Sequence, residues 1–370
     1  MRSALVLSAA FALWACQPAG APRPARGAPA ASYDVGARPS AVAAADFDGD
    51  GRLDVAVANS ADGTATVLKG AGGGRLRQAV GSPFPAGREP SDVEAADLDR
   101  DGDVDLLFAN HETAQVTVLL NDGRAHFRAA PGSPFETGAR PHVHGLSAAD
   151  FDGDGWPDVA VDSADTREVR LLRGGPRGLA PGAPVPLGTM PYQRLGAADV
   201  DGDGLRDVLV PGHVDSTVRF VQRAGAGLAQ AARSILLGGR PWVVAGDDVD
   251  GDGRADVIVV QTDAVSVWLA GREGFSQAPG SPFPVPGATG VATGDLDGDG
   301  AAEVVVGPWD GDEVTLLAGR GLTARKVHAC ERPIGLAIAD LDGDGRGEIL
   351  AACAVGNRLA VISPPLVRRP

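Results

Sequence analysis

Short apolar stretches recur along most of the chain, and each of them follows a Gly-rich acidic loop. The stretch DFDGDGRLDVAV begins at Asp46, and close variants begin at positions 97, 150, 199, 248, 295 and 340. The starts of these seven copies are separated by 51, 53, 49, 49, 47 and 45 residues. A regular period of this size indicates a solenoid, a propeller or another repeat array.

Each period has the pattern of four short strands and no helical periodicity. A Gly/Pro turn such as GARPS (36–40) and an Ala-rich segment precede the acidic loop, and an apolar strand such as DLLFAN (105–110) follows it. An alternating strand such as QVTVLLN (115–121) and a looser segment, which carries GSPF in three copies, complete the period. Four strands per period predict a propeller blade, with the Ala-rich strand innermost, where strands of all blades converge.

The two ends of the repeat region predict how the ring closes. After Glu348 only two strands remain, so the last blade has three strands when IGLAIAD (334–340) is included. The segment ASYDVG (31–36) is a spare strand that can complete this blade and remove an open sheet edge. We therefore predict an all-β, seven-bladed β-propeller of four-stranded blades over residues 32–370, closed by an N-terminal strand completing the last blade.

The beginning of the chain lacks the repeat and indicates export. Arg2 precedes an apolar stretch, 4–15, that is too short to span a bilayer comfortably. A secretory signal peptide fits this pattern better than a buried helix does. Residues 16–31 are rich in Pro and Ala without apolar periodicity, which is typical of a tether.

The end of the apolar stretch resembles a bacterial lipobox. It reads LWAC, with Leu13 three residues before Cys16. The resemblance implies that residues 1–15 are removed and that Cys16 is lipidated, and the alternative is cleavage near Ala19 or Ala21. We expect an exported cell-envelope lipoprotein, in the periplasm or on the outer surface, that meets the membrane only through its lipid anchor.

The composition constrains the core and the class of partner, mainly through the net charge of the chain. Of 370 residues 44% are hydrophobic but only 5% aromatic, so Val, Leu, Ile and Ala must build the core. The net charge of -15 argues against a nucleic-acid partner, because phosphate binding requires a basic face. Seven loops with four acids each account for 28 of the 48 acidic residues, so the acidity reflects the loops.

The acidic loops have the residue pattern of a calcium site. Acids fall at loop positions 1, 3, 5 and 9, and Gly stands at position 6 in all copies and at position 4 in all but the second, which has Arg100. Calcium takes six to eight oxygens at about 2.3–2.6 Å, and Gly permits the sharp turn that makes alternate acids converge. We expect up to seven Ca²⁺, each held by four acids and the carbonyl of position 7. The acidic ligands are Asp46, Asp48, Asp50 and Asp54; Asp97, Asp99, Asp101 and Asp105; Asp150, Asp152, Asp154 and Asp158; Asp199, Asp201, Asp203 and Asp207; Asp248, Asp250, Asp252 and Asp256; Asp295, Asp297, Asp299 and Glu303; and Asp340, Asp342, Asp344 and Glu348.

Two other interpretations of these loops are less consistent with the pattern. A helical EF-hand begins in the same way but needs Glu at position 12, where this chain has apolar residues such as Val57. Seven solvated acidic turns are the other alternative, and their regular repetition argues against it. Seven Ca²⁺ would bring the net charge from -15 to -1, and their binding to the folded loops would stabilise the fold.

The repeated D-x-D-G-D-G-x-x-D/E motif resembles the FG-GAP/VCBS repeats, including the calcium-binding blades of integrin α-subunit propellers. The resemblance covers about residues 32–370 and implies a seven-bladed propeller with calcium between the first and second strands of each blade. The Phe-Gly signature that names the family is not obvious, so the chain is most similar to bacterial VCBS-type lipoproteins.

The opposite face is where the blades differ, as an asymmetric ligand site requires. Its turns carry rings and charges that could contact a sugar or a peptide. The candidates are His111, His142, His144, Tyr192, Arg194, His213, Trp242, Trp309 and Asp310. We expect a monomeric propeller that binds a protein or glycan ligand there.

An enzyme is the alternative function. The four histidines of this face could hold a transition metal or act as general bases in a polysaccharide lyase or hydrolase, although neither a nucleophile elbow nor HExxH is present. The enzyme gains weight if they line one pocket within about 5 Å of one another or of an acid. A spread around the rim favours the binding module.

Two cysteines fall near the ligand side of the last blade. Cys330 precedes ERPIG, and Cys353 ends EILAAC, which places both at adjacent strand ends. Export permits a disulfide between them, and two small buried thiols are the alternative.

Overall fold

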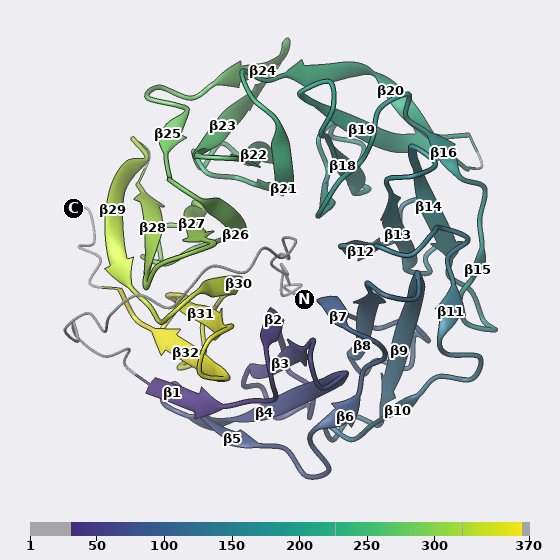
Figure 1. The fold of residues 1–370 in the computed structure, drawn as a ribbon, viewed down its shortest axis with the longest axis vertical. Coiled ribbons are helices and arrows are strands. Elements are labelled where there is room, and N and C mark those ends of the chain that lie inside the picture. The colour runs from purple at the N-terminus through teal and green to yellow at the C-terminus, as the bar shows by residue number, and fades with distance from the viewer. Residues whose placement is uncertain (1–30, 226, 320, 365–370) are drawn as a thin grey trace.

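The computed structural model describes residues 31–225, 227–319 and 321–364. Within these ranges the chain forms strands and no helix, and the strands build seven antiparallel sheets around a central axis (Figure 1). The predicted seven-bladed β-propeller is confirmed. No described segment is a helix that could cross a membrane. The predicted signal peptide and the lipidation site Cys16 lie outside the described residues.

Every blade consists of four strands that run outward from the axis. The innermost strands are β2 (Pro39–Ala45), β7 (Pro90–Ala96), β12 (Leu146–Ala149), β17 (Gly196–Ala198), β21 (Pro241–Asp247), β26 (Ala288–Gly294) and β30 (Pro333–Ala339). The second strands are β3 (Asp54–Asn59), β8 (Asp105–Asn110), β13 (Asp158–Ser163), β18 (Asp207–Gly212), β22 (Asp256–Gln261), β27 (Glu303–Pro308) and β31 (Glu348–Cys353). The third strands are β4 (Thr64–Gly72), β9 (Gln115–Asn121), β14 (Glu168–Arg173), β19 (Thr217–Ala224), β23 (Ala264–Gly271), β28 (Glu313–Ala318) and β32 (Arg358–Ile362).

The outermost strands vary most between blades. They are β5 (Arg75–Gln78), β10 (Phe127–Ala129), β15 (Ala180–Pro181), β20 (Gly227–Leu236), β24 (Gly274–Gln277), β29 (Thr323–His328) and β1 (Ala31–Asp34). Blades 1, 2, 3 and 5 add a short strand that also pairs with the third strand. These additions are β6 (Phe84–Pro85), β11 (Phe135–Glu136), β16 (Val185–Pro186) and β25 (Phe283–Pro284).

The ring closes through the N-terminal strand, as predicted. Strand β1 pairs antiparallel with β32, from Ala31 opposite Val361 to Asp34 opposite Arg358, beside each other in Figure 1. The hydroxyl of Tyr33 also accepts a hydrogen bond from the backbone N–H of Leu76 in blade 1, at 3.0 Å. The first described residues therefore tie the last blade to the first.

The core lies within and between the blades. All residues of the second strands are buried, because blades cover both faces of each sheet. The innermost strands approach one another so closely that small residues are required. A Cβ atom on Gly335 would lie 2.6 Å from the carbonyl oxygen of Ser40, across the junction between blades 7 and 1.

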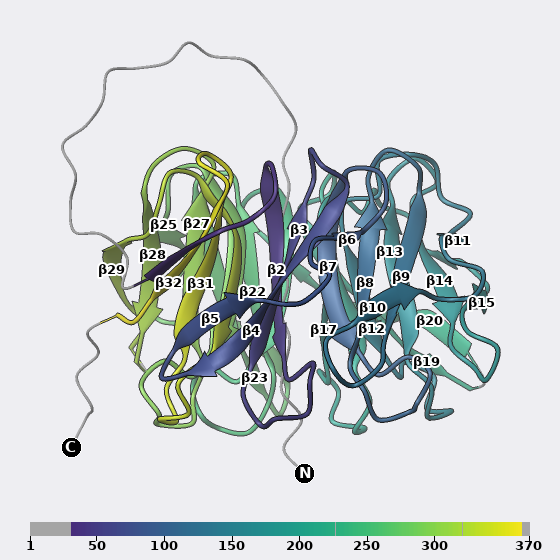
Figure 2. The ribbon, with the colours of Figure 1, turned by 90° about the horizontal axis from the view of Figure 1, so that it is seen from below.

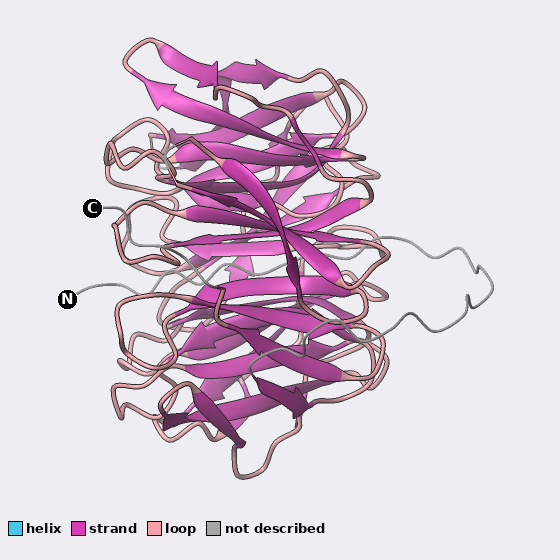
Figure 3. Ribbon diagram, turned by 90° about the vertical axis from the view of Figure 1, so that its left-hand side faces the viewer, coloured by secondary structure: helices cyan, strands magenta, loops and turns pink. Residues whose placement is uncertain are grey.

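The propeller is a disc, and loops emerge on both of its faces (Figures 2 and 3). Because the strands of a blade are antiparallel, the loops between innermost and second strands all emerge on one face, here called the acidic-loop face. The turns between second and third strands and the connections between blades emerge on the other, here called the ligand face. At this face the structure joins Cys330 and Cys353, at the end of β31, by a disulfide.

Candidate functional site

The glycines of the acidic loops adopt positive φ angles, which produce the sharp turn of each loop. In the first loop Gly49 and Gly51 have φ angles of 71° and 83°, and both N–H groups donate to the carboxylate of Asp46, each at 2.8 Å. In the second loop Arg100 takes the place of the first glycine and adopts a φ of 60°. Its guanidinium reaches away to the ring of Trp156 in the next blade, 5.1 Å from the centroid.

The loop carboxylates converge as a metal site requires. One oxygen from each of Asp46, Asp48 and Asp50 lies within 4.8 Å of the other two. The second and fourth loops show the same arrangement at positions 1, 3 and 5. In the third loop the group consists of Asp150, Asp152 and the position-9 residue Asp158. One hard cation could contact three such oxygens at once, so the donor set fits calcium.

The position-9 acid connects the loop to the blade. Asp54 accepts hydrogen bonds from the N–H of Phe47 at 3.0 Å and of Gly70, in the third strand, at 2.7 Å. Burial raises the pKa of Asp54 to about 6, the two N–H donors oppose this rise, and Asp48 and Asp46 add to it. A bound cation would favour the ionised carboxylate. Burial likewise raises the pKa of the position-9 acids Asp105, Asp158, Asp207, Asp256, Glu303 and Glu348.

Some loops already contain a cationic or amide partner from the third strand. Lys69 forms an ion pair with Asp48, and the Arg173 guanidinium lies 3.4 Å from Asp152. Both residues stand one position before the N–H that bonds the position-9 acid. At the equivalent position the other blades have Leu120, Gln222, Leu269, Ala318 and Ser363. The loops therefore differ in how much positive charge they hold before any metal binds.

Six rings form an unbroken run on the ligand face. The ring centroids of His111 lie 4.7 Å from His142 and 5.2 Å from His144, and His144 lies 4.7 Å from Tyr192. Tyr192 continues to His213 at 5.2 Å, and His213 continues to Trp242 at 4.5 Å. The run crosses blades 2 to 5, and it brings together six of the nine residues that the sequence singled out.

A buried acid positions the central histidine. His144 is 2% exposed and Asp162 is 0% exposed, and His144 Nδ1 lies 3.0 Å from Asp162 Oδ2. The backbone N–H groups of His144 and Gly145 donate to Asp162 Oδ1 at 2.9 and 3.3 Å. In the neutral ring Nδ1 carries the proton, because a carboxylate only accepts. Among the described residues, no hydrogen-bond partner reaches His144 Nε2, which is left as an acceptor.

The neighbouring His111 is held in a less basic state. Burial lowers its pKa, and the nearby rings of His144 and His142 lower it further, while Glu112 opposes the shift. Its Nε2 lies 3.3 Å from His142 Nδ1. Single ligand atoms of His111, Glu89 and Glu112 also lie within 4.8 Å of one another.

A cavity of about 180 Å³ lies next to the ring run. Trp242 and Trp309 line it together with Gln193, Thr262 and Thr289, and Trp242 Nε1 donates to Thr262 Oγ1 at 3.1 Å. We call this cavity the tryptophan slot. Gln193 is 1% exposed, so its amide is a buried polar group at the wall of a largely apolar slot.

Two of the nine predicted ligand-face residues, Arg194 and Asp310, lie outside the ring run and do not line the tryptophan slot. Arg194 is 1% exposed, and its guanidinium lies 2.5 Å from Asp92 of blade 2, so it links blades 2 and 4 beneath the ligand face. This differs from the surface role that the sequence indicated. The Asp310 side chain is exposed, 3.9 Å from Arg332, whose guanidinium lies 4.4 Å from the Trp309 ring centroid.

The centre of the ring holds a further acid. Burial raises the pKa of Glu94 to about 8, Asp92 adds to this rise, and the N–H of Ala148, Arg206 and Arg194 oppose it. The Ala148 N–H donates to the Glu94 carboxylate at 2.7 Å. Glu94 lines a cavity of only about 20 Å³ between the innermost strands. It stands where the other innermost strands have Ala, Gly or Ser, so it is the one acid at this position of the innermost strands.

The sequence analysis missed Asp162, Gln193 and Glu94, although each carries a signal. Asp162 is a charged residue at the fifth position of the second strand, where the other six blades have Ala, Pro, Val or Gly. Gln193 occupies the sixth position before the acidic loop, as His144 and Trp242 do in their blades. A comparison of the repeats position by position would have identified them.

A family model for the FG-GAP-like repeat matches residues 46–108, 97–161 and 248–306. Among solved structures, BBS1N in complex with ARL6DN, from a crystal soaked with lead, is similar with a TM-score of 0.63 and 14% identity, over 92% of this chain and 98% of that chain. Virginiamycin B lyase from Staphylococcus aureus is similar with a TM-score of 0.58 and 8% identity, over 90% and 97% of the two chains. At these identities the likeness concerns the fold alone. No curated protein matches the sequence.

Proposed function

This chain is an FG-GAP repeat β-propeller, and we propose that it acts as an interaction module whose ligand, a protein segment or a glycan, binds across the ligand face. The observation that carries the proposal is the unbroken run of rings from His142 to Trp242. Four of the six histidines of the chain belong to this run, so rings are concentrated there and not scattered over the surface.

The chemistry of the ligand face supports an amphipathic ligand. Tyr192 and Trp242 offer apolar ring faces, which stack on sugars or on apolar side chains. The tryptophan slot beside them is large enough for one such group. The BBS1N propeller is solved in complex with a protein, ARL6DN, which is consistent with a protein ligand here.

We further propose that the acidic loops hold Ca²⁺ and that the protein is exported. Positions 1, 3, 5 and 9 would supply the carboxylates, and the ion would fix the loop between the innermost and second strands. The disulfide of blade 7 supports an oxidising compartment. With a lipid on Cys16, the propeller would be a monomeric cell-envelope lipoprotein.

A panel of glycans, polysaccharides and purified envelope proteins tests the interaction module, scored for both binding and product release. We expect binding without turnover, and at least tenfold weaker binding for Tyr192→Ala and Trp242→Ala. Trp156→Ala is the matched control, because Trp156 stands on the acidic-loop face. Equal loss of binding in all three variants would contradict a ligand site on the ligand face.

A polysaccharide lyase or hydrolase is the second candidate, and the Asp162–His144 pair favours it. His111 contacts both His142 and His144, and Asp162 lies 3.0 Å from His144, so three of the four histidines gather near an acid, whereas His213 contacts Tyr192 and Trp242 instead. His144 Nε2 would accept the proton while Asp162 stabilises the charged ring. Product release that disappears in a His142→Ala/His144→Ala double variant would establish this function and displace the binding module.

A further inference from the structure

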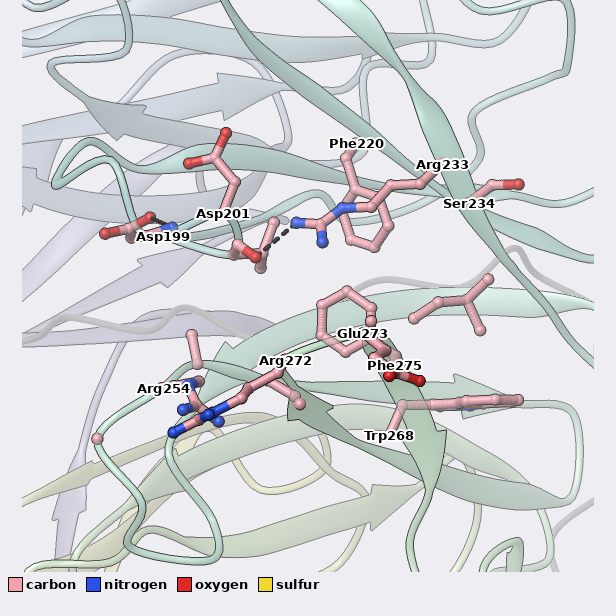
Figure 4. A pocket seen from close by; sticks show the side chains of 18 of the residues that line it. Asp199, Asp201, Phe220, Arg233, Ser234, Arg254, Trp268, Arg272, Glu273 and Phe275 are labelled. Carbon is pink, nitrogen blue, oxygen red and sulfur yellow. Dashed lines mark hydrogen bonds between the residues drawn. The ribbon is translucent and has the colours of Figure 1, made fainter.

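A second hollow lies at the outer rim, between blades 4 and 5 (Figure 4). It has a volume of about 840 Å³, and its walls come from β19 and β20 on one side and from β23 and β24 on the other. None of the residues singled out on the ligand face lines it. We call it the rim groove.

The junction between blades 1 and 2 shows how this space is filled elsewhere. Phe47 follows the first aspartate of the acidic loop, Phe84 belongs to the GSPF segment, and Phe127 lies in the outermost strand of the next blade. The ring of Phe127 contacts both of the others edge-to-face, with centroids 5.4 Å apart in each pair. Three large rings therefore close that junction.

At the junction between blades 4 and 5 two of these three rings are missing. Val200 occupies the loop position of Phe47, and Ile235 pairs with the third strand where Phe84 does in blade 1. Only Phe275, the counterpart of Phe127, is retained. The rim groove therefore lies where two additional phenylalanine rings pack at the other junction.

The floor of the rim groove is aromatic and carries a positive charge. Phe220 and Phe275 stack with centroids 5.5 Å apart, and the Arg233 guanidinium lies 5.5 and 5.3 Å from these two rings. A bulge in β20, where residues 231–233 face Phe220 alone, brings Arg233 to this place. Trp268 lines the same wall, and its Nε1 has no hydrogen-bond partner among the described residues. A ligand with an acceptor oxygen would satisfy it.

The charges around the rim groove favour an anionic ligand. Arg233, Arg254 and Arg272 line it. Arg254 is paired with Asp252, whereas Arg272 is exposed and makes no ion pair within the part of the chain that the structure describes. The nearby acids Asp199 and Asp201 accept hydrogen bonds from N–H groups of their own loop, which reduces their effect on the groove. Of the lining acids, only Glu273 lies outside that loop.

The hollow continues toward the ligand face. A neighbouring cavity of about 490 Å³ shares Leu236 and Trp268 with the rim groove and reaches Thr262, which also lines the tryptophan slot. Leu236 is 72% exposed at the point where the two cavities meet, an uncommon position for a large apolar side chain. An extended ligand could follow this path along the junction.

We propose that the rim groove binds an extended acidic peptide segment of a partner protein. An aromatic or aliphatic side chain of the peptide would lie against Phe275, Trp268 and Leu236, whereas Phe220 beneath them is buried. Its carboxylates would face Arg233 and Arg272, and a backbone carbonyl would accept from Trp268 Nε1. An exposed leucine beside an aromatic floor requires an apolar side chain, which favours a peptide over a glycan. The proposal does not depend on what the ligand face binds.

An array of ten-residue peptides tests the proposal with the full chain. Each peptide carries a central Phe, Trp or Leu flanked by Asp and Glu, and its partner peptide has Lys in place of the acids. We expect the acidic series to bind at least tenfold more tightly, and the preference to weaken as salt rises. Equal binding of the two series, or none by either, would overturn the proposal.

Two kinds of variant locate the binding. Ile235→Phe restores the ring found in blade 1 and narrows the base of the groove without removing any charge, so acidic peptides should bind less tightly. Arg272→Glu should reduce affinity at least tenfold, whereas Arg128→Glu, on the outermost strand of the filled junction, should have no effect. Unchanged binding by both Ile235→Phe and Arg272→Glu, with unchanged melting temperatures, would exclude the rim groove.

Discussion

At the scale of single residues, Asp162 determines the geometry of the ligand face. Its two oxygens accept three hydrogen bonds, from His144 Nδ1 and from the N–H groups of His144 and Gly145. Without the carboxylate these buried donors would lose their acceptor, and the His144 ring would lose the contact that fixes its orientation and proton. Because Asp162 holds the proton of the neutral ring on Nδ1, it leaves His144 Nε2 as the acceptor nitrogen.

We expect Asp162→Ala to lower the free energy of unfolding by about 3 kcal/mol, because it leaves buried donors unpaired. Asp162→Asn keeps one acceptor oxygen and should lower it less, while still weakening ligand binding. Chemical denaturation measures the first effect, and NMR of the His144 ring nitrogens measures the change in proton position. Asp165→Ala is the control, since that side chain is 58% exposed. Equal losses in the Asp165 and Asp162 variants would contradict the argument.

Glu94 should make the free energy of unfolding depend on pH, and a Glu94 variant can measure its contribution. Its pKa is about 8 in the folded chain against an ordinary value of 4.5, so the folded state binds the proton more tightly. The resulting stability is present below pH 4.5 and is lost as the pH rises through 8. Relative to the wild type, Glu94→Gln should therefore become progressively more stable between these pH values. Melting curves at several pH values test this, with the exposed Glu331→Gln as control, and parallel profiles would refute it.

At the scale of the elements, the third strands place different residues beside the acidic loops. Lys69 in β4 and Arg173 in β14 place a cation beside the position-3 aspartate of their loops. The equivalent residue is Leu269 in β23 and Ala318 in β28. Because an internal cation and a metal ion repel each other, we expect the loop of blade 6 to bind calcium more tightly than those of blades 1 and 3, whereas in the loop of blade 5 Arg254 pairs with Asp252.

Substitutions at Lys69 and Leu269 test whether a third-strand cation weakens calcium binding by the neighbouring loop. Lys69→Met should tighten calcium binding at the first loop by roughly tenfold, which corresponds to about 1.4 kcal/mol. Leu269→Lys should weaken the fifth loop by a similar factor. Calorimetric titration of each variant gives the affinities and the number of ions bound. If neither exchange changes the affinities, the internal cations do not compete with the metal.

At the scale of the whole molecule, the repeat period determines what the sequence can predict. The seven acidic loops specify the blades, and strand alternation specifies which face carries His111 or Trp242. The repeat pattern does not specify contacts between different blades, because these contacts join residues from different repeats. Arg194 pairs with Asp92, 102 residues away, and both stand five residues before the first aspartate of their acidic loops. The rim groove was not predictable either. Val200 and Ile235 are smaller than Phe47 and Phe84 at the equivalent positions of blade 1, but all four residues are apolar and fit the same sequence pattern.

If the acidic loops bind calcium, ring closure should make its effect a property of the whole fold. Each ion that binds a folded loop and not the unfolded chain stabilises by about 1.4 kcal/mol at a free concentration tenfold above its dissociation constant. The blades share their cores and β1 joins the last to the first, so these contributions should act on one cooperative transition. We therefore expect a chelator to lower a single melting temperature by well over ten degrees, and calcium but not magnesium to restore it. An unchanged melting temperature would show that the loops hold the fold together through their own hydrogen bonds, such as those of Asp54 with Phe47 and Gly70, without a metal.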